Sequence, residues 1–182
     1  ENSMKRLMIV VALLLVAIPL AAQSGRMPGM RGSGDLGSMM SGMTVGPDAT
    51  VYVMRHVNGS TNAYELAAIR PSGTVAWTAP LNVTGATQVA VNSTTVFVSS
   101  FGTMGTFPNL AIKSQIIGFN AASGAKVFAN DLDGIAVDLD AFNDGVYVLE
   151  VAMNGAGMMT NIGRKLVSVS NTGKTNFSLP LD

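Results

Sequence analysis

The segment from Gly85 to Gly134 decides the fold, because its pattern of short apolar runs and glycine-bearing turns is repeated before and after it. It holds TVFV (Thr95–Val98) and, after a loop, QIIGFNAASGAKVF (Gln115–Phe128). The Val-aromatic-Val triplet of this segment recurs 45 residues upstream as VYV (51–53) and 50 residues downstream as VYV (146–148). Each copy also has a glycine followed four residues later by an aromatic residue. Self-similarity with such a period is typical of stacked supersecondary units.

Short runs rich in Val, Ile, Thr and aromatic residues, separated by Asn-Gly, Ser-Gly, Asp-Gly and Thr-Gly, predict four strands in each copy. The expected strands are 44–46, 49–56, 63–70 and 75–81 in the first copy, 88–92, 95–101, 114–120 and 125–131 in the second, and 135–140, 145–152, 164–170 and 174–179 in the third.

The triplets are apolar on both faces of the pleat, so each sheet should be covered on both sides. A β-propeller achieves this by packing each blade between its neighbours, whereas the strands of a two-layer sandwich, the main alternative, should alternate apolar and polar residues. We therefore predict an all-β fold: a partial β-propeller of three four-stranded antiparallel blades, at about 45–84, 85–134 and 135–182.

Two further segments precede the repeat. Lys5-Arg6 and the apolar run from Leu7 to Ala22, which ends in small residues, have the layout of a secretory signal peptide over residues 1–24. A retained signal anchor is the alternative, and the chain would then touch a membrane only through this segment. Residues 25–44 are rich in Met, Gly and Ser without periodicity, which predicts a flexible linker. We expect a secreted or periplasmic protein, with a signal-peptide helix and a disordered linker ahead of the blades.

Composition narrows the function classes. The 182 residues carry 11 basic and 11 acidic side chains, so the net charge is zero and the electrostatic case for nucleic-acid binding is absent. There is no cysteine, which excludes a disulfide, a thiolate metal site and a lipidated N-terminal cysteine within this sequence. The single histidine, His56, has no partner for a hydrolase triad.

The run Ile116–Phe128, with the Val-Phe-Val strand ahead of it, resembles the blade repeat of pyrroloquinoline-quinone-type (PQQ-like) propellers. The usual wording of that repeat is a hydrophobic pair, Ala-Leu-Asp, two small residues, Thr-Gly-Lys and a tryptophan four residues after the glycine. The resemblance covers residues 44–182 and implies that Trp77, Phe128 and Phe177 are blade-interface aromatics. Enzymes of that family hold their quinone with calcium, carboxylates, a stacking tryptophan and an adjacent pair of cysteines. This chain has no cysteine and no tryptophan beyond Trp77, so the resemblance implies the non-catalytic branch and transfers no catalytic or cofactor-binding residue.

Candidate metal sites are few. Thioether sulfur suits Cu(I), and five methionines of the linker are weak candidates for it: Met27, Met30, Met39, Met40 and Met43. Asp138 and Asp140 are weak calcium candidates within an acidic cluster, but Phe142 stands where a calcium loop needs an oxygen ligand. We interpret that cluster as strand ends and a turn.

The loops between second and third strands (57–62, 102–113 and 153–163) should all emerge at one end of the blades. Adaptable side chains in them suit a protein-binding surface, or else fold back on the blade edges. These binding-loop candidates are Met104, Phe107, Met153, Met158 and Met159.

The sequence thus predicts an exported, non-enzymatic propeller that needs no cofactor and binds an unidentified protein partner. The alternatives are the N-terminal fragment of a PQQ-dependent dehydrogenase and a Met-rich Cu(I)-binding protein. Three blades are too few to close a ring, so either remaining blades beyond Asp182 or self-association is required, and we favour a fragment.

Overall fold

A computed structural model describes residues 42–57, 64–81, 83, 85–104, 111–152 and 163–181. The predicted signal peptide and most of the predicted linker lie outside the described residues. The described residues, from Gly42 onward, belong to one compact unit, which contains all the strands considered below. No helix with the length and apolarity of a membrane span occurs in the part of the chain that the structure describes.

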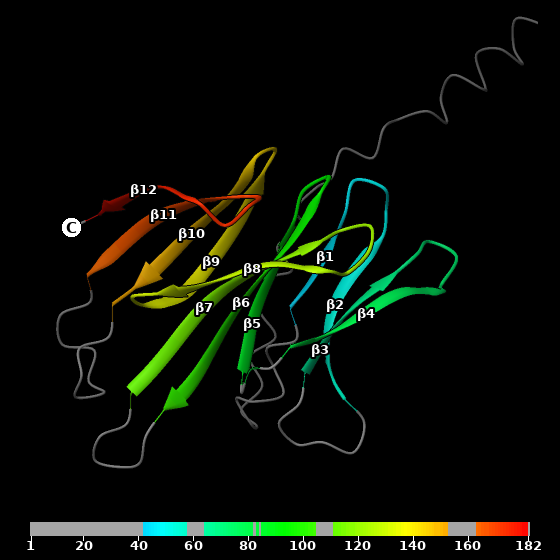
Figure 1. The fold of residues 1–182 in the computed structure, drawn as a ribbon, viewed down its shortest axis with the longest axis horizontal. Helices are drawn as coiled ribbons and strands as arrows, with labels where there is room; N and C mark the ends of the chain where they lie inside the picture. The colour runs from blue at the N-terminus through cyan, green and yellow to red at the C-terminus, as the bar shows by residue number, and fades with distance from the viewer. Residues whose placement is uncertain are drawn as a thin grey trace, which may run out of the picture. The chain divides into compact units, whose positions relative to one another are not determined.

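The described residues form twelve strands in three antiparallel sheets of four (Figure 1). The first sheet contains β1 (Met43–Val45), β2 (Val51–His56), β3 (Tyr64–Ile69) and β4 (Val75–Leu81). The second contains β5 (Gly85–Val91), β6 (Thr95–Met104), β7 (Ala111–Asn120) and β8 (Lys126–Leu132). The third contains β9 (Ile135–Phe142), β10 (Gly145–Val151), β11 (Arg164–Ser170) and β12 (Thr175–Pro180).

Within each sheet, strands adjacent in sequence pair with each other, as in a propeller blade. The strand order predicted from the repeat is confirmed, with boundaries that shift by a few residues. The second strand begins at Val51 rather than at residue 49, because Ala49 adopts φ +61° in the turn that follows Gly46. The central strands β6 and β7 extend to ten residues each, beyond the predicted lengths.

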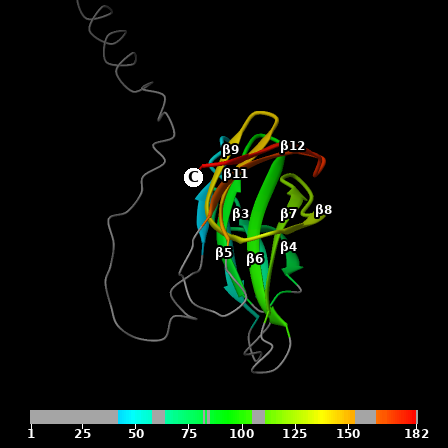
Figure 2. The same ribbon diagram turned by 90° about the vertical axis from the view of Figure 1, so that its left-hand side faces the viewer.

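The sheets lie side by side and pack face to face (Figures 1 and 2). The opening strands β1, β5 and β9 contact one another in sequence, so the first strand of every blade lies on the same side of the stack. One apolar core joins the first and second sheets and another joins the second and third. The fold is therefore the predicted all-β, three-blade, partial propeller.

The triplets place their residues on alternate faces. We call the face of a blade that packs on the following blade its forward face, and the opposite one its rear face. Tyr52 and Phe97 are buried on forward faces, whereas Val96 and Val98 lie on the rear face of the second blade, in the core shared with the first. Because neighbouring residues of a strand point to opposite sides, the apolar triplet supplies both faces at once.

Candidate functional site

Trp77 of the first blade lies against the second. Its indole Nε1 donates a hydrogen bond to the carbonyl oxygen of Ala121 at 2.9 Å, and the hydroxyl of Tyr52 donates to the same oxygen at 3.3 Å. A Cβ atom built on Gly124 would lie 2.5 Å from Trp77 Cε3, so the indole covers this glycine closely. Gly124 has φ +73°, and only glycine provides both that conformation and the space for the ring.

Phe128 repeats the arrangement one blade further on. It borders the core between the second and third sheets, and a Cβ atom on Gly173 would lie 2.6 Å from its Cγ. The side-chain amide of Asn130 donates to the carbonyl oxygen of Gly173 at 2.5 Å. The aromatic residue of one blade thus covers the glycine turn of the next at both internal interfaces.

Phe177 is placed differently. It lies on the forward face of the third blade and 43% of it is exposed, because no described strand covers this face. Its ring lies 6.2 Å from that of Tyr147, which in turn stacks on Phe142 at 4.5 Å. Three aromatic rings therefore line an open sheet face.

Asn92 is an interface residue that the sequence reasoning missed. Its side-chain amide donates to the carbonyl oxygen of Phe142 at 2.7 Å and to Asn171 Oδ1 at 2.8 Å, both in the third blade. Its Oδ1 accepts from the backbone nitrogens of Thr94 and Thr95 in its own blade. An Asn followed by Ser-Thr indicates a turn, which predicts the bonds from Asn92 to Thr94 and Thr95. The local sequence does not indicate the bonds from Asn92 to the third blade.

The ends of β2 and β3, of β6 and β7, and of β10 and β11 lie at one edge of the sheets, at the bottom of Figure 1. We call this the loop-bearing edge. On the first blade it carries an ion pair from Arg55 Nε to Glu65 Oε1 at 2.7 Å, and the rings of His56 and Tyr64 lie 4.2 Å apart. Cross-strand pairs of this kind hold the two strand ends in register.

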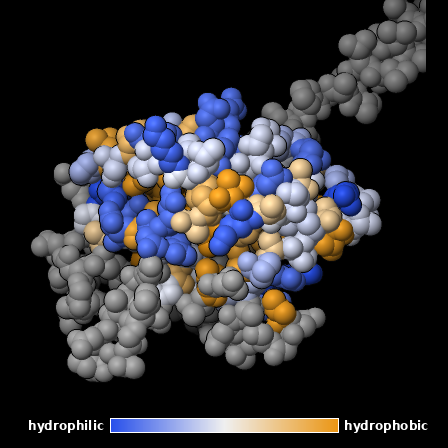
Figure 3. Space-filling model, in the orientation of Figure 1, coloured by the Kyte–Doolittle hydropathy of each residue, from blue (hydrophilic) through white to orange (hydrophobic). Residues whose placement is uncertain are grey.

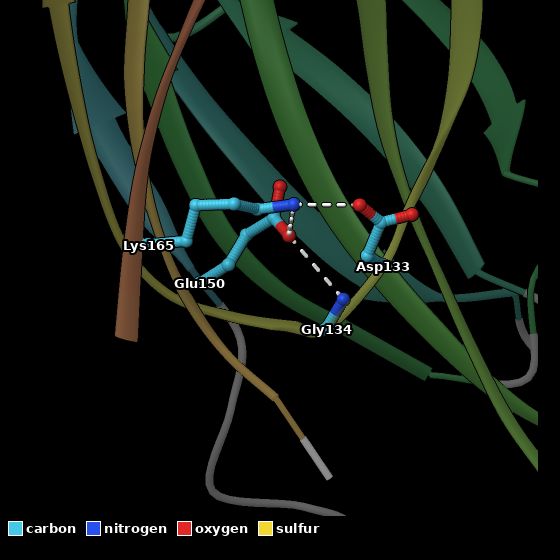
Figure 4. Close-up of polar contacts among 4 residues, drawn as sticks. All are labelled: Asp133, Gly134, Glu150 and Lys165. Carbon is cyan, nitrogen blue, oxygen red and sulfur yellow. Dashed lines mark hydrogen bonds and ion pairs between the residues drawn. The ribbon is translucent and has the colours of Figure 1, made fainter. Parts of the chain in front are cut away.

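On the third blade the loop-bearing edge contains a buried carboxylate (Figure 4). Glu150 follows Val146 and Val148 on the side of β10 that packs on the second blade, and 2% of it is exposed. Lys165 Nζ lies 3.2 Å from Glu150 Oε2 and 2.7 Å from Asp133 Oδ2. The backbone nitrogen of Gly134 also donates to Glu150, at 3.3 Å.

Burial of Lys165 opposes its positive charge, but the hydrogen bonds to Asp133 and Glu150 outweigh this effect and raise its pKa. Asp133 and Gly134 are the link between β8 and β9, so the ammonium group ties the connection between two blades to β10. The neighbouring hollow, of about 130 Å³, is lined by groups of the second and third sheets that include Asn130 and Asp131. The charges of Lys165, Glu150 and Asp133 are paired with one another, and these ion pairs hold the edge of the third blade together. We call this cluster the brace.

The calcium candidates Asp138 and Asp140 lie within β9, where they pair across the sheet with Leu149 and Tyr147. Asp133 is engaged by Lys165, and Asp131 accepts a hydrogen bond from Gln115. Among the described residues, no three His, Cys, Asp or Glu side chains are grouped as metal ligands.

The linker methionines, apart from Met43, lie outside the described residues. Met43 is an exposed residue of β1. The binding-loop candidates Phe107, Met153, Met158 and Met159 are also outside, and of Met104 only its place at the end of β6 is described.

No family model matches the chain, and no curated protein matches it. A mutant apocarotenoid oxygenase from Synechocystis is similar in structure, with a TM-score of 0.44 and 8% identity. The match covers 72% of this chain and 34% of that one, so the chain spans about a third of the length of the oxygenase. The described residues themselves define the fold as three consecutive four-stranded propeller blades.

Proposed function

We propose that this protein is an exported, non-enzymatic β-propeller module of the PQQ-like repeat type, which binds a protein partner through its loop-bearing edge. The observation that carries the proposal is the braced construction of that edge. All three connections between second and third strands start there. In the first blade the strand ends are tied by the Arg55–Glu65 pair, and in the third blade by the Lys165–Glu150–Asp133 cluster. Loops on a rigid frame are the usual binding elements of such scaffolds.

Two features favour recognition of a protein surface. The edge combines paired charges with the exposed rim residue Val57 and the His56–Tyr64 ring pair. Aromatic residues and arginine are enriched at protein interfaces, and this edge carries Tyr64 and Arg55. The apolar N-terminal run after Lys5-Arg6 supports export, and the cysteine-free composition is compatible with an oxidising compartment.

The test is site-specific photo-crosslinking in the host cell. A photoreactive residue replaces the exposed Val57 at the loop-bearing edge, and a matched one replaces Lys174 in the exposed turn before β12, at the opposite edge. We expect a discrete adduct with an envelope or extracellular protein from position 57 and none from position 174. Equal labelling from both positions, or a chain that stays in the cytoplasm with residues 1–24 attached, would contradict the proposal.

A further inference from the structure

The two internal interfaces follow one design. On the forward face of each covered blade a central aromatic lies beside the outer-strand aromatic: Tyr52 and Trp77 at 5.8 Å, Phe97 and Phe128 at 6.3 Å. The glycine turn of the next blade then lies under the outer ring. Each interface therefore has two halves, an aromatic pair and a glycine turn.

The third blade carries an aromatic pair without a turn to cover it. Tyr147 and Phe177 lie 6.2 Å apart, as in the covered blades. Tyr147 is nevertheless 38% exposed, whereas its counterparts Tyr52 and Phe97 are 3% and 0% exposed. Leu179 lies two residues after Phe177, on the same face of β12, and is exposed as well. The aromatic half of an interface is therefore in place on the third blade, and no described residue packs against it.

The first blade carries the opposite half, a glycine turn without a ring. Gly73 has φ +82°, and its nitrogen donates to Arg70 O at 2.8 Å, as Gly173 N, with φ +86°, does to Ser170 O at 3.0 Å. A Cβ atom built on Gly73 would meet no atom within 4 Å. The Gly73 turn therefore has the conformation of the covered Gly173 turn, and the space for a ring beside it is open.

The rear face around this turn is apolar. Direct cross-strand pairing aligns one residue from each of the four strands in a row: Val45, Val51, Ile69 and Val75. Tyr52 points into the core with the second blade, so its neighbour Val51 and the rest of this row lie on the free side. Val45 and Val75 are exposed. In the second and third blades the corresponding faces are the buried ones, with Val96 and Val146 in the place of Val51.

We propose that a second copy of this chain occupies both faces, with Phe177 of each copy over Gly73 of the other, so that two copies close one ring of six blades. The contact is heterologous, and a heterologous contact must close or it grows without limit. Propellers typically hold about four to eight blades, and two copies of the three described sheets give six. The aromatic pair and the glycine turn already have the geometry that they have in the internal interfaces. Association therefore needs little further ordering of side chains, which lowers its free-energy cost.

The test uses the full chain as the host processes it, studied by sedimentation equilibrium. The expected species has twice the mass of one chain as it is isolated from the host. Phe177→Asp places a carboxylate on the aromatic face, and Gly73→Asn fills the open turn with a residue that tolerates positive φ. Each variant should raise the dissociation constant of the dimer at least about a hundredfold, since it damages both contacts of the ring. Val127→Asp, at a similarly exposed site of the middle blade, is the matched control and should stay dimeric.

Mixing the two variants gives the decisive result. In a mixed pair, one contact carries both substitutions, while the other joins an intact Phe177 to an intact Gly73. A mixture should therefore form a dimer at least about tenfold tighter than either variant alone. A symmetric face-to-face contact cannot be rescued in this way. Thermal unfolding of each variant shows that the fold itself survives.

Three outcomes would overturn the proposal. A chain that is monomeric at every concentration would assign the faces to another occupant, such as a further blade following Asp182. Open-ended oligomers would show that the contact does not close. Variants that each associate like the wild type would show that Phe177 and Gly73 are outside the contact.

Discussion

Replacing Gly124 with alanine should destabilise the protein far more than the same change at Gly73. Both glycines have positive φ, +73° and +82°, so both substitutions incur about 1–2 kcal/mol of backbone strain. Only Gly124 lies under a ring: its new Cβ would be 2.5 Å from Trp77 Cε3 and 2.6 Å from Cδ2, well inside the usual 3.5–4.0 Å contact. Displacing the indole costs about 1–3 kcal/mol of overpacking and about 1 kcal/mol for the lost bond to Ala121. We expect the two losses to differ by roughly 2–4 kcal/mol.

Urea unfolding measures this difference directly. Trp77 is the single tryptophan, so its fluorescence reports the first interface, and far-ultraviolet circular dichroism reports the sheets. The chain is kept dilute enough to be monomeric, because association would add a ring over Gly73 and make its loss depend on concentration. Equal losses at the two positions would refute the idea that the aromatic-over-glycine contact holds the blades together. A fluorescence midpoint unchanged by Gly124→Ala would do the same.

Three further predictions follow from the contacts. Asn92→Ala should lower the free energy of unfolding by about 2–3 kcal/mol in urea titration. It removes the interblade bonds to Phe142, Asn143 and Asn171 and leaves the backbone nitrogens of Thr94 and Thr95 without their acceptor. A loss under about 0.5 kcal/mol would contradict the bridging role. Trp77→Phe should cost about 1–2 kcal/mol, since the ring stays while the bond to Ala121 goes, and a calorimetric scan that matches the wild type would count against that bond. The raised pKa of Lys165 stabilises the fold at pH values below its unfolded pKa, near 10.5, and this contribution is lost as the pH rises through the folded value. The stability gap between wild type and Lys165→Met should therefore narrow above about pH 10.5 in pH-dependent unfolding, and a gap that widens there would be evidence against the brace.

Much of the architecture is readable from local chemistry. Strand positions follow from runs of β-branched and aromatic residues, and turns from Asn-Gly, Thr-Gly and similar pairs, because both signals depend on residues close in sequence. The spacing of Gly124 and Phe128 is equally local. These signals were enough to predict three four-stranded sheets and most strand ends.

The candidate site was harder to predict. Glu150 reads as one polar residue in an otherwise apolar strand, and its place on the Val146–Val148 side was the available signal that it is buried. A buried carboxylate such as Glu150 needs a cation beside it, and here that cation is Lys165. Only the β10–β11 register brings Lys165 opposite Glu150. Asn92 likewise meets Asn171 from 79 residues away, through sheet packing that no local pattern encodes.

The sequence by itself determined the blades, since each is a local meander whose turns and apolar triplets specify pairing and pleat. Tertiary structure alone decided that Trp77 and Phe128 cover the turn glycines of the next blade, Gly124 and Gly173, rather than the turn glycines four residues before them. The reason is that Gly124 lies 47 residues beyond Trp77 and meets it only when the sheets stack. Tertiary structure also decided that Phe177 and Gly73 remain open at opposite ends of the stack, because a face is buried only where another sheet lies against it.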